Sequence, residues 1–593
     1  IKDDMATFCM AIKESTTKDG DKVFGVCFVD TATSELNFIE LVDDDECTKL
    51  DTLITQIKPK EVLCEKHNLC STAVKAIKYS AHSLHQIWNY LNPYSEFWNY
   101  LNPYSEFWDY DTTVEKLVES KYYAGEDLDD FSNYPEILLQ FKENHHTAFS
   151  AFGALLYYLK TLKLDESIMT LKNMKQYQIS KSAASHMLLD GVTLTNLEIL
   201  NNTFDGSDKG TLFKLLNRAI TPFGKRMMKQ WVLYPLMNVD QIDLRYDAVE
   251  FLMNQEPELR VTLESALNKL PDLERLIARV HSKTLRFKDF LKVIEGFEAV
   301  SKLFKNLQAA DLLQAGAMKS FVSRFPSELY GIIASWEDAF DRAEALNNVV
   351  VPAEGVDSEF DESTGIIKSL EAQLNDHLRE YKKQFKSHEI CYRDSGKELY
   401  LIEMPIKIKS IPKDWQQMAA TSKVKRYWSP EVKKLVRELM EQKELHKVVC
   451  ENIVAKLYTR FDVNYKTWVS VIQSVGYMDC LVALAKTSET MGFPSCRPTF
   501  SDSEQGLLLF EELRHPCFVG TSDFIPNDIR LGNEHANFGL LTGANAAGKS
   551  TLMRTTALAV ILSQIGCFIP AREAHVTPVD KIMTRLGAND NII

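Results

Sequence analysis

The segment LLTGANAAGKSTLMR, residues 540–554, constrains the fold of this chain more than any other stretch. Residues 543–550 match the pattern G-x-x-x-x-G-K-[ST] at every fixed position. A short apolar run at 538–542 precedes this loop and predicts a buried strand, while residues 551–564 carry apolar side chains on one side and predict a helix. A strand, a glycine-containing loop and a helix in this order are typical of an α/β domain.

The chemistry of this loop predicts a nucleotide site. Glycines let the backbone turn tightly, so successive N–H groups and the N-terminus of the helix face a polyphosphate. Lys549 is predicted to neutralise the β- and γ-phosphates and Ser550 to bind Mg²⁺, so we expect ATP or ADP with Mg²⁺. The predicted nucleotide-binding residues of the loop are Gly543, Ala544, Asn545, Ala546, Ala547, Gly548, Lys549, Ser550 and Thr551.

The sequence after the loop contains few acidic residues. Hydrolysis of a nucleotide usually needs a second strand that ends in carboxylates, which hold Mg²⁺ and orient the attacking water. The acidic residues after Ser550 are Glu573, Asp580 and Asp590, and none of them ends an apolar run. We therefore predict no complete catalytic set in this chain. Because the sequence begins with Ile1 instead of Met, we also expect it to be a piece of a larger protein, cut at both ends.

Composition predicts a multidomain globular chain. At about 150 residues per domain, 593 residues suggest about four domains. No apolar run reaches the 18 residues of a membrane span, so we expect no membrane association. The 11 cysteines include no C-x-x-C pair, which favours free thiols in a reducing compartment and argues against a zinc site. A net charge of −14 argues against nucleic-acid binding by bulk charge, and binding by local patches stays open.

The first part of the chain alternates strand and helix signals. Residues 22–30 and 36–41 predict a hairpin, 61–65 a later strand and 149–162 a closing helix. These elements predict a small α/β domain.

A decapeptide inside this region, WNYLNPYSEF, occurs twice in succession, at 88–97 and 98–107. Its aromatic residues are suited to stacking on bases. The interpretation that we favour is a duplication in a surface loop, where added length costs little closure entropy, and a sequence artefact is a further alternative.

The middle of the chain predicts an arm. Residues 181–360 have an almost entirely helical pattern, and two longer helices follow at 363–390 and 430–458. Between these two helices, 398–404 and 406–409 predict strands. Two long helices that flank a strand-rich insert form an arm with a tip. The approximate heptad of the first long helix consists of Ile367, Leu370, Leu374, Leu378, Tyr381 and Phe385.

The predicted tip is basic. Its only nearby carboxylate in the sequence is Glu431, and Tyr427 and Trp428 lie among the cations. A charge run of this kind is either a solvated face or a grip on DNA phosphates, which requires cations but little sequence specificity. The cations of the tip are Lys423, Lys425, Arg426, Lys433 and Lys434.

The loop resembles the nucleotide loop of the MutS family, T-G-P-N-M-G-G-K-S-T, with Ala544, Ala546 and Ala547 in place of Pro, Met and Gly. Further blocks are similar to the same family in both the ATPase region and the helical region. They are 189–200, 221–236, 270–281, 513–516, 523–528, 566–571 and 584–590.

This resemblance implies a multidomain α/β plus α fold. It implies a connector α/β domain at 1–162, a helical core and lever at 163–362, a clamp arm and tip at 363–435, returning lever helices at 436–495, and the N-terminal part of an ABC-type P-loop ATPase domain at 496–593.

The resemblance also implies a function. The parent protein would be a DNA mismatch-repair ATPase and DNA damage sensor. As a nuclear heterodimer with MutS homologue two, it would clamp double-stranded DNA with mispairs and signal to MutL-type repair factors. Phe524 and Ile525 would pack on adenine, and Lys423, Lys425 and Arg426 would contact DNA.

Two alternatives stay open: a meiotic MutS-type clamp on DNA junctions, and a structural chromosome-maintenance ATPase. The second would need much longer heptad arms. The family's mismatch wedge, Phe-x-Glu, is expected before Ile1, and its presence there would favour repair over the meiotic alternative.

Overall fold

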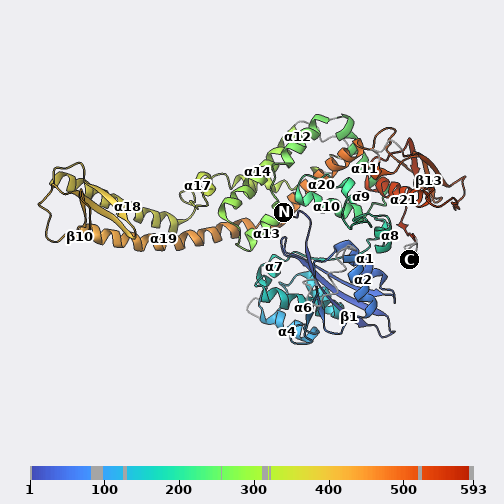
Figure 1. The fold of residues 1–593 in the computed structure, drawn as a ribbon, viewed down its shortest axis with the longest axis horizontal. Helices are drawn as coiled ribbons and strands as arrows, with labels where there is room; N and C mark the ends of the chain where they lie inside the picture. Colours follow the sequence, from blue (N-terminus) through green and yellow to red (C-terminus); the bar gives the residue numbers. More distant parts are fainter. Residues whose placement is uncertain are drawn as a thin grey trace. The chain divides into compact units, whose positions relative to one another are not determined.

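The computed structural model describes residues 3–81, 98–123, 130–255, 257–309, 318, 322–518 and 524–586. The chain divides into two compact units (Figure 1). The first comprises Ile1–Thr284, Glu295–Leu329 and Tyr465–Ile593, and the second comprises Leu285–Ile294 and Tyr330–Asn464. Sheets and helices occur in both units, so the protein is a mixed α/β multidomain chain.

The first unit opens with a six-stranded sheet of order β5-β4-β1-β2-β3-β6. The predicted hairpin and the strand at 61–65 are confirmed: β1, β2 and β3 pair antiparallel, and β4 is parallel to β1. β5 is parallel to β4, and β6 is parallel to β3. The strands are β1 (Phe8–Thr16), β2 (Lys22–Asp30), β3 (Glu35–Asp43), β4 (Glu61–Glu65), β5 (Trp98–Leu101) and β6 (Met174–Gln176).

Both faces of this sheet are buried. Because successive strand residues point to opposite faces, Cys27 packs on the side of α6 (His146–Thr161), whereas Val26 packs on the side of α1 (Thr48–Ile57) and α2 (Ser71–Ala81). Figure 1 shows these helices on the two sides of the sheet.

Gly25 allows α6 to approach β2 closely. A Cβ at Gly25 would lie 2.2 Å from the backbone nitrogen of Ala148 in α6. The remaining helices near this sheet are α4 (Tyr110–Glu119), α5 (Glu136–Asn144) and α7 (Asp165–Leu171).

The second copy of the decapeptide is part of this sheet, which corrects the prediction of a surface loop. Residues 98–101 form β5 and pair with β4, and Leu101 and Phe107 are buried in the core. The partner strand β4 lies more than thirty residues earlier in the sequence, so no local pattern announces the pairing. The first copy, 88–97, lies outside the described residues.

Helices form the middle of the first unit around α20, and several of their buried contacts are polar. The Asp479 carboxylate of α20 accepts hydrogen bonds from the backbone N–H of Ile220 at 3.0 Å and of Thr221 at 2.7 Å, just before α10 begins. The elements of this region are β7 (Leu188–Leu189), α8 (Gly191–Asn196), α9 (Leu212–Leu216), α10 (Pro222–Leu233), α11 (Val239–Glu250), a π-helical turn (Phe251–Gln255), α12 (Pro257–Leu267), α13 (Leu273–His281), most of α14 (Phe287–Ala309) and α20 (Tyr465–Glu489). The start of α14 and most of α16 (Glu328–Ala334) belong to the second unit.

Among the described helices, α20 alone is long and apolar enough to cross a membrane, by length and composition only. Of the 18-residue window that meets this test, 78% is buried inside the protein. The sequence has no continuous apolar run of this length here, because polar residues such as Ser470, Gln473 and Asp479 interrupt it.

The last part of the chain adds a four-stranded sheet of order β12-β15-β13-β14. The predicted helix at 551–564 is confirmed as α21, whose C-terminal half is buried and whose first turn is exposed. β16 then pairs parallel with β7. The elements are β12 (Thr499–Phe500), β13 (Leu507–Leu513), a 3₁₀ turn (Pro516–Phe518), β14 (Asn527–Gly532), α21 (Lys549–Ile565), β15 (Glu573–Val576) and β16 (Lys581–Ile582).

The second unit contains the predicted arm. Helices α18 and α19 lie side by side, and the strands between them form a sheet of order β10-β11-β9-β8 (Figure 1). Leu370, Leu374 and Tyr381 of the predicted heptad are buried in their shared core. The elements are α17 (Arg342–Leu346), α18 (Ser358–Gln384), β8 (Cys391–Ser395), β9 (Glu398–Pro405), β10 (Gln416–Ala420), β11 (Val424–Trp428) and α19 (Pro430–Asp462).

One predicted strand of the arm is wrong. The prediction at 398–404 is confirmed as β9, but residues 406–409 form no strand and 406–407 lie in a turn. The N–H of Ile408 donates to the carbonyl of Pro405 at 3.0 Å, which closes the turn and removes that N–H from strand pairing.

Candidate nucleotide-binding site

The loop at 543–548 has a turned backbone that ends in a helix N-terminus. Ala546 and Gly548 have φ values of 63° and 90°, in the left-handed region. Gly548 is the N-cap residue of α21. Left-handed residues within a loop turn successive N–H groups to one side, which is the geometry that binds anions.

Lys549 reaches back across the loop. Its Nζ donates to the carbonyl oxygen of Gly543 at 2.7 Å and to that of Ala544 at 2.6 Å. Ser550 is exposed in the first turn of α21. The loop carbonyls thus hold the ammonium group beside the turned backbone, so the residues present fit a polyphosphate with its cation.

The strand predicted just before the loop is not formed. Residues 538–542 form no strand, and Phe538 and Leu540 are 77% and 81% exposed. The four-stranded sheet uses β14 and β15 but does not include this run, so within the described part of the chain no strand pairs with it. An apolar run becomes a strand only where another strand pairs with it.

The two residues predicted to pack on adenine lie just before β14. Ile525 is 78% exposed, and Phe524 is half-buried with its ring at an edge to His515, 6.4 Å between centroids. The blocks that carried the family resemblance are only partly described, since Asp523 and residues 587–590 lie outside the described residues.

His515 is a structural residue in this arrangement. Its Nδ1 accepts a hydrogen bond from the N–H of Cys517 at 3.1 Å, within the 3₁₀ turn. Burial, and then the nearby Arg554 cation, lower the pKa of His515 to about 4. The ring is therefore neutral at pH 7 and acts as an acceptor.

Two residues of α11 hold the far end of α21, and sequence reasoning missed both. The Arg245 guanidinium donates to the carbonyl of Ile565, the last residue of the helix, at 2.9 Å. The Tyr246 hydroxyl lies 2.8 Å from the carbonyl oxygen of Ser563. A cation at a helix C-terminus is favourable for the helix dipole. Because α11 is more than 300 residues earlier in the chain, no local signal links it to the loop.

At the arm tip, Lys423 and Lys425 are exposed, whereas Arg426 is half-buried. The Arg426 Nε lies 2.9 Å from Glu403 Oε2, and the two residues are cross-strand partners on β11 and β9. Glu431 is the nearby carboxylate in the sequence, and strand pairing brings Glu403 to the tip as well. Of the three predicted DNA contacts, the two lysines remain open to solvent.

Known protein families match most of the chain. Models of three MutS domains match: domain II at 7–175, domain III at 192–485 and domain V at 539–593. These matches include the six-stranded sheet, the helices with the arm, and the loop with α21.

Curated relatives match the chain over nearly its whole length. The DNA mismatch repair protein MSH6 of Saccharomyces cerevisiae is 47% identical over 621 residues, which cover 100% of this chain and 48% of the relative. Msh6 of Gallus gallus is 31% identical over 99% of this chain and 48% of the relative. Msh3 of Homo sapiens is 26% identical over 97% of this chain and 50% of the relative. The chain spans about half the length of these relatives, and it belongs to the MutS family.

Proposed function

We propose that this chain is part of an ATP-dependent clamp on mismatched DNA. The whole protein recognises mispairs as a nuclear heterodimer with MutS homologue two and signals to MutL-type repair factors. The observation that carries this proposal is the 47% identity to a DNA mismatch repair protein over the entire chain, loop and arm included. The relatives named above are mismatch-repair proteins, which favours repair over the meiotic and chromosome-maintenance alternatives.

Residues 496–593 contribute the N-terminal part of a P-loop ATPase domain in this proposal, and they bind ATP or ADP with Mg²⁺. The nucleotide and its metal supply the phosphoryl chemistry. The loop N–H groups and Lys549 bind the phosphates, Ser550 holds Mg²⁺, and Phe524 and Ile525 contact the adenine. The exposed loop and the free surface of Ile525 support this assignment.

Binding without turnover is the activity that we propose for these 593 residues. The described acidic residues after Ser550 are Glu573, which begins β15, and Asp580. Neither follows an apolar strand, so neither has the position from which family carboxylates orient water.

DNA contact is assigned to the arm. Lys423 and Lys425 bind phosphates, and Arg426, held by Glu403, supports the strand that carries them. In this proposal the rest of the chain is divided into a connector at 1–162, a helical core and lever at 163–362, the clamp arm at 363–435 and returning lever helices at 436–495.

A chimera tests the proposed function. The matching half of yeast MSH6 is replaced by this chain in cells that lack their own copy, and the mutation rate is measured. We expect the chimera to restore a low mutation rate and the Lys549→Ala chimera not to restore it. A chimera that is expressed and bound to its partner subunit, yet leaves the mutation rate as high as in the deletion strain, would exclude the proposal.

A further inference from the structure

Two cavities adjoin each other in the first unit, beside α10 and α20. The first has a volume of about 420 Å³ and the second about 450 Å³, both within the usual range for small-molecule sites. They adjoin because some residues line both. These shared residues are Lys181, Met227, Gln230, Tyr234 and Gln473.

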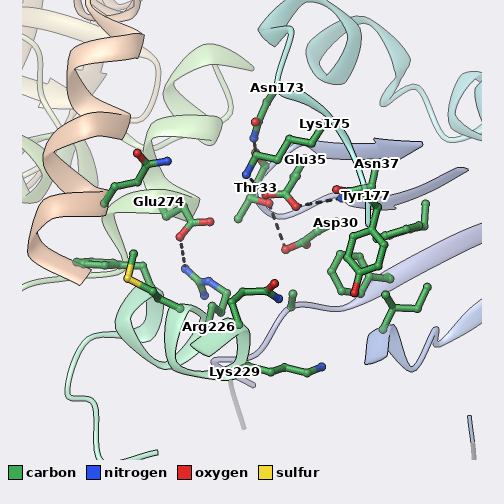
Figure 2. A pocket seen from close by; sticks show the side chains of 18 of the residues that line it. Asp30, Thr33, Glu35, Asn37, Asn173, Lys175, Tyr177, Arg226, Lys229 and Glu274 are labelled. Atoms are coloured by element: carbon green, nitrogen blue, oxygen red, sulfur yellow. Dashed lines mark hydrogen bonds and ion pairs between the residues drawn. The ribbon is translucent and has the colours of Figure 1, made fainter. Parts of the chain in front are cut away.

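The charges of the first cavity are mostly compensated (Figure 2). Lys175 pairs with Glu35 at 3.0 Å, and Arg226 contacts Glu274 at 3.4 Å. Figure 2 shows the two pairs among the side chains that line the cavity. Glu35 and Glu274 thus neutralise two of the cations that line this cavity.

Among the described residues, those that line the second cavity include cations and no carboxylate. Its charged residues are Lys181, Arg245 and Arg324, together with His186. Its neutral lining residues are Met227, Gln230, Trp231, Tyr234, Ser470, Gln473, Ser474 and Tyr477. The two adjoining cavities therefore differ in charge although they share part of their walls.

Arg245 is the most buried cation of this cavity. Arg245 is 7% exposed. Its guanidinium lies 3.7 Å from the centre of the Trp231 ring, and one of its N–H groups donates to the carbonyl of Ile565. Its Nε has no hydrogen-bond partner, and no described carboxylate forms an ion pair with it. A buried charge normally has an anionic partner, because transfer out of water is costly.

Aromatic rings hold these cations in place. Lys181 Nζ lies 4.7 Å from the centre of the Tyr234 ring, as Arg245 lies over Trp231. Ring faces attract cations but do not neutralise them. The amine of Lys181 therefore keeps its N–H donors for another acceptor.

The positive potential affects the neighbouring groups. Burial, followed by the charges of Lys181 and Arg245, lowers the pKa of His186 to about 4. Burial and the Arg245 charge also lower the pKa of Lys181. Arg245 therefore opposes the protonation of Lys181, and both cations oppose the protonation of His186.

We propose that the second cavity binds a phosphate-bearing small molecule through Lys181, Arg245 and Arg324. A compact oxyanion offers several acceptor oxygens to the separate N–H donors of a lysine and two arginines. The amides of Gln230 and Gln473 provide further donors. This site is separate from the loop at 543–548 and stands without the proposed repair function.

The test uses this chain with Lys549→Ala, so that the loop does not bind phosphate. Inorganic phosphate, pyrophosphate and AMP are titrated by calorimetry. We expect saturable binding of at least one of them with a Kd below about 1 mM. Pyrophosphate as the tightest ligand would identify a polyphosphate site, and AMP as the tightest would identify a nucleotide. No binding of any of the three would overturn the proposal.

Substitutions locate the binding. Lys181→Gln together with Arg324→Gln should weaken binding at least tenfold, and Arg324→Gln alone is used if the double variant does not fold. The matched control is Lys175→Gln, which removes a cation of the compensated cavity. An equal loss of affinity in Lys175→Gln, or no loss in a folded cavity variant, would contradict the assignment.

Discussion

Two stretches of this chain consist of Phe-Gly followed by an aliphatic residue, but one forms a strand and the other does not. Phe24-Gly25-Val26 lies in the centre of β2, where Phe24 is fully buried. Phe538-Gly539-Leu540 forms no strand, and Phe538 is 77% exposed. β2 has a strand on each side and helices on both faces, whereas no described strand pairs with the second stretch. Neighbouring elements, more than local sequence, decide which apolar run becomes a strand.

The largest predicted effect tests whether the loop works without a strand before it. Lys549→Ala should abolish ATP and ADP binding, because it removes the cation that faces the β- and γ-phosphates. The measurement is a titration with a fluorescent nucleotide, and Lys581→Ala, an exposed lysine of β16, serves as the control. A parallel phosphate-release assay should show no turnover. Magnesium-dependent release that disappears in Lys549→Ala would mean that the chain does contain a catalytic acid.

The second prediction compares the two glycines directly. Gly25→Ala should lower the free energy of unfolding by about 3 kcal/mol, because the added Cβ would lie 2.2 Å from the backbone of α6. Gly539→Ala should have almost no effect, since the nearest atom would be 3.8 Å away. Urea denaturation measures both. Equal effects would show that the second stretch is as closely packed in solution as the first.

The sequence predicts those elements whose signal is local. The arm helices follow from a periodicity of apolar residues such as Leu370 and Leu374, which are buried as expected. The hairpin of β2 and β3 is likewise contained within twenty-two residues. The start of α21 is likewise predicted from the glycine-containing loop motif that directly precedes it.

The remaining features depend on partners that are distant in the sequence. Glu403 meets Arg426 only because β9 pairs with β11, and Arg245 reaches Ile565 from a helix more than 300 residues earlier. β5 is formed only because β4 lies beside it. A single sequence contains no signal for such pairs.

The third prediction concerns pH and His515, a residue that is neutral because of its neighbours. Its folded-state pKa of about 4 lies below the ordinary value of 6.5, so the neutral ring stabilises the fold above pH 6.5. This stability is lost as the pH falls from 6.5 towards 4, by up to about 3 kcal/mol. Urea denaturation at pH 7.5 and pH 4.5 should show a larger loss for the wild type than for His515→Asn. An equal loss in both proteins would show that His515 does not contribute.

The fourth prediction tests whether the pairing of a cation with a carboxylate decides which residues of the arm tip bind DNA. Replacing Lys423, Lys425 and Arg426 with Ala should weaken duplex binding similarly for all sequences. Each lost phosphate contact should flatten the salt dependence by about 0.9 log unit. Because Glu403 already pairs with Arg426, the double lysine variant should account for most of this change. An unchanged salt slope in the double lysine variant would identify the tip as a solvated face.

The smallest effect is expected for the repeated decapeptide. Deletion of 88–97 and deletion of 98–107 produce the same protein, because the two copies are identical, so one copy always remains to form β5 beside β4. The connection between α2 and β5 becomes ten residues shorter, which changes the closure entropy by less than about 1 kcal/mol. Thermal unfolding, nucleotide affinity and DNA affinity should therefore stay nearly as they are. A deletion variant that folds but binds DNA more weakly would show that both aromatic copies contact DNA. A variant whose free energy of unfolding falls by several kcal/mol would show that the sheet needs the longer connection. The length of the connection would then matter for the formation of β5 as much as the neighbouring strand β4 does.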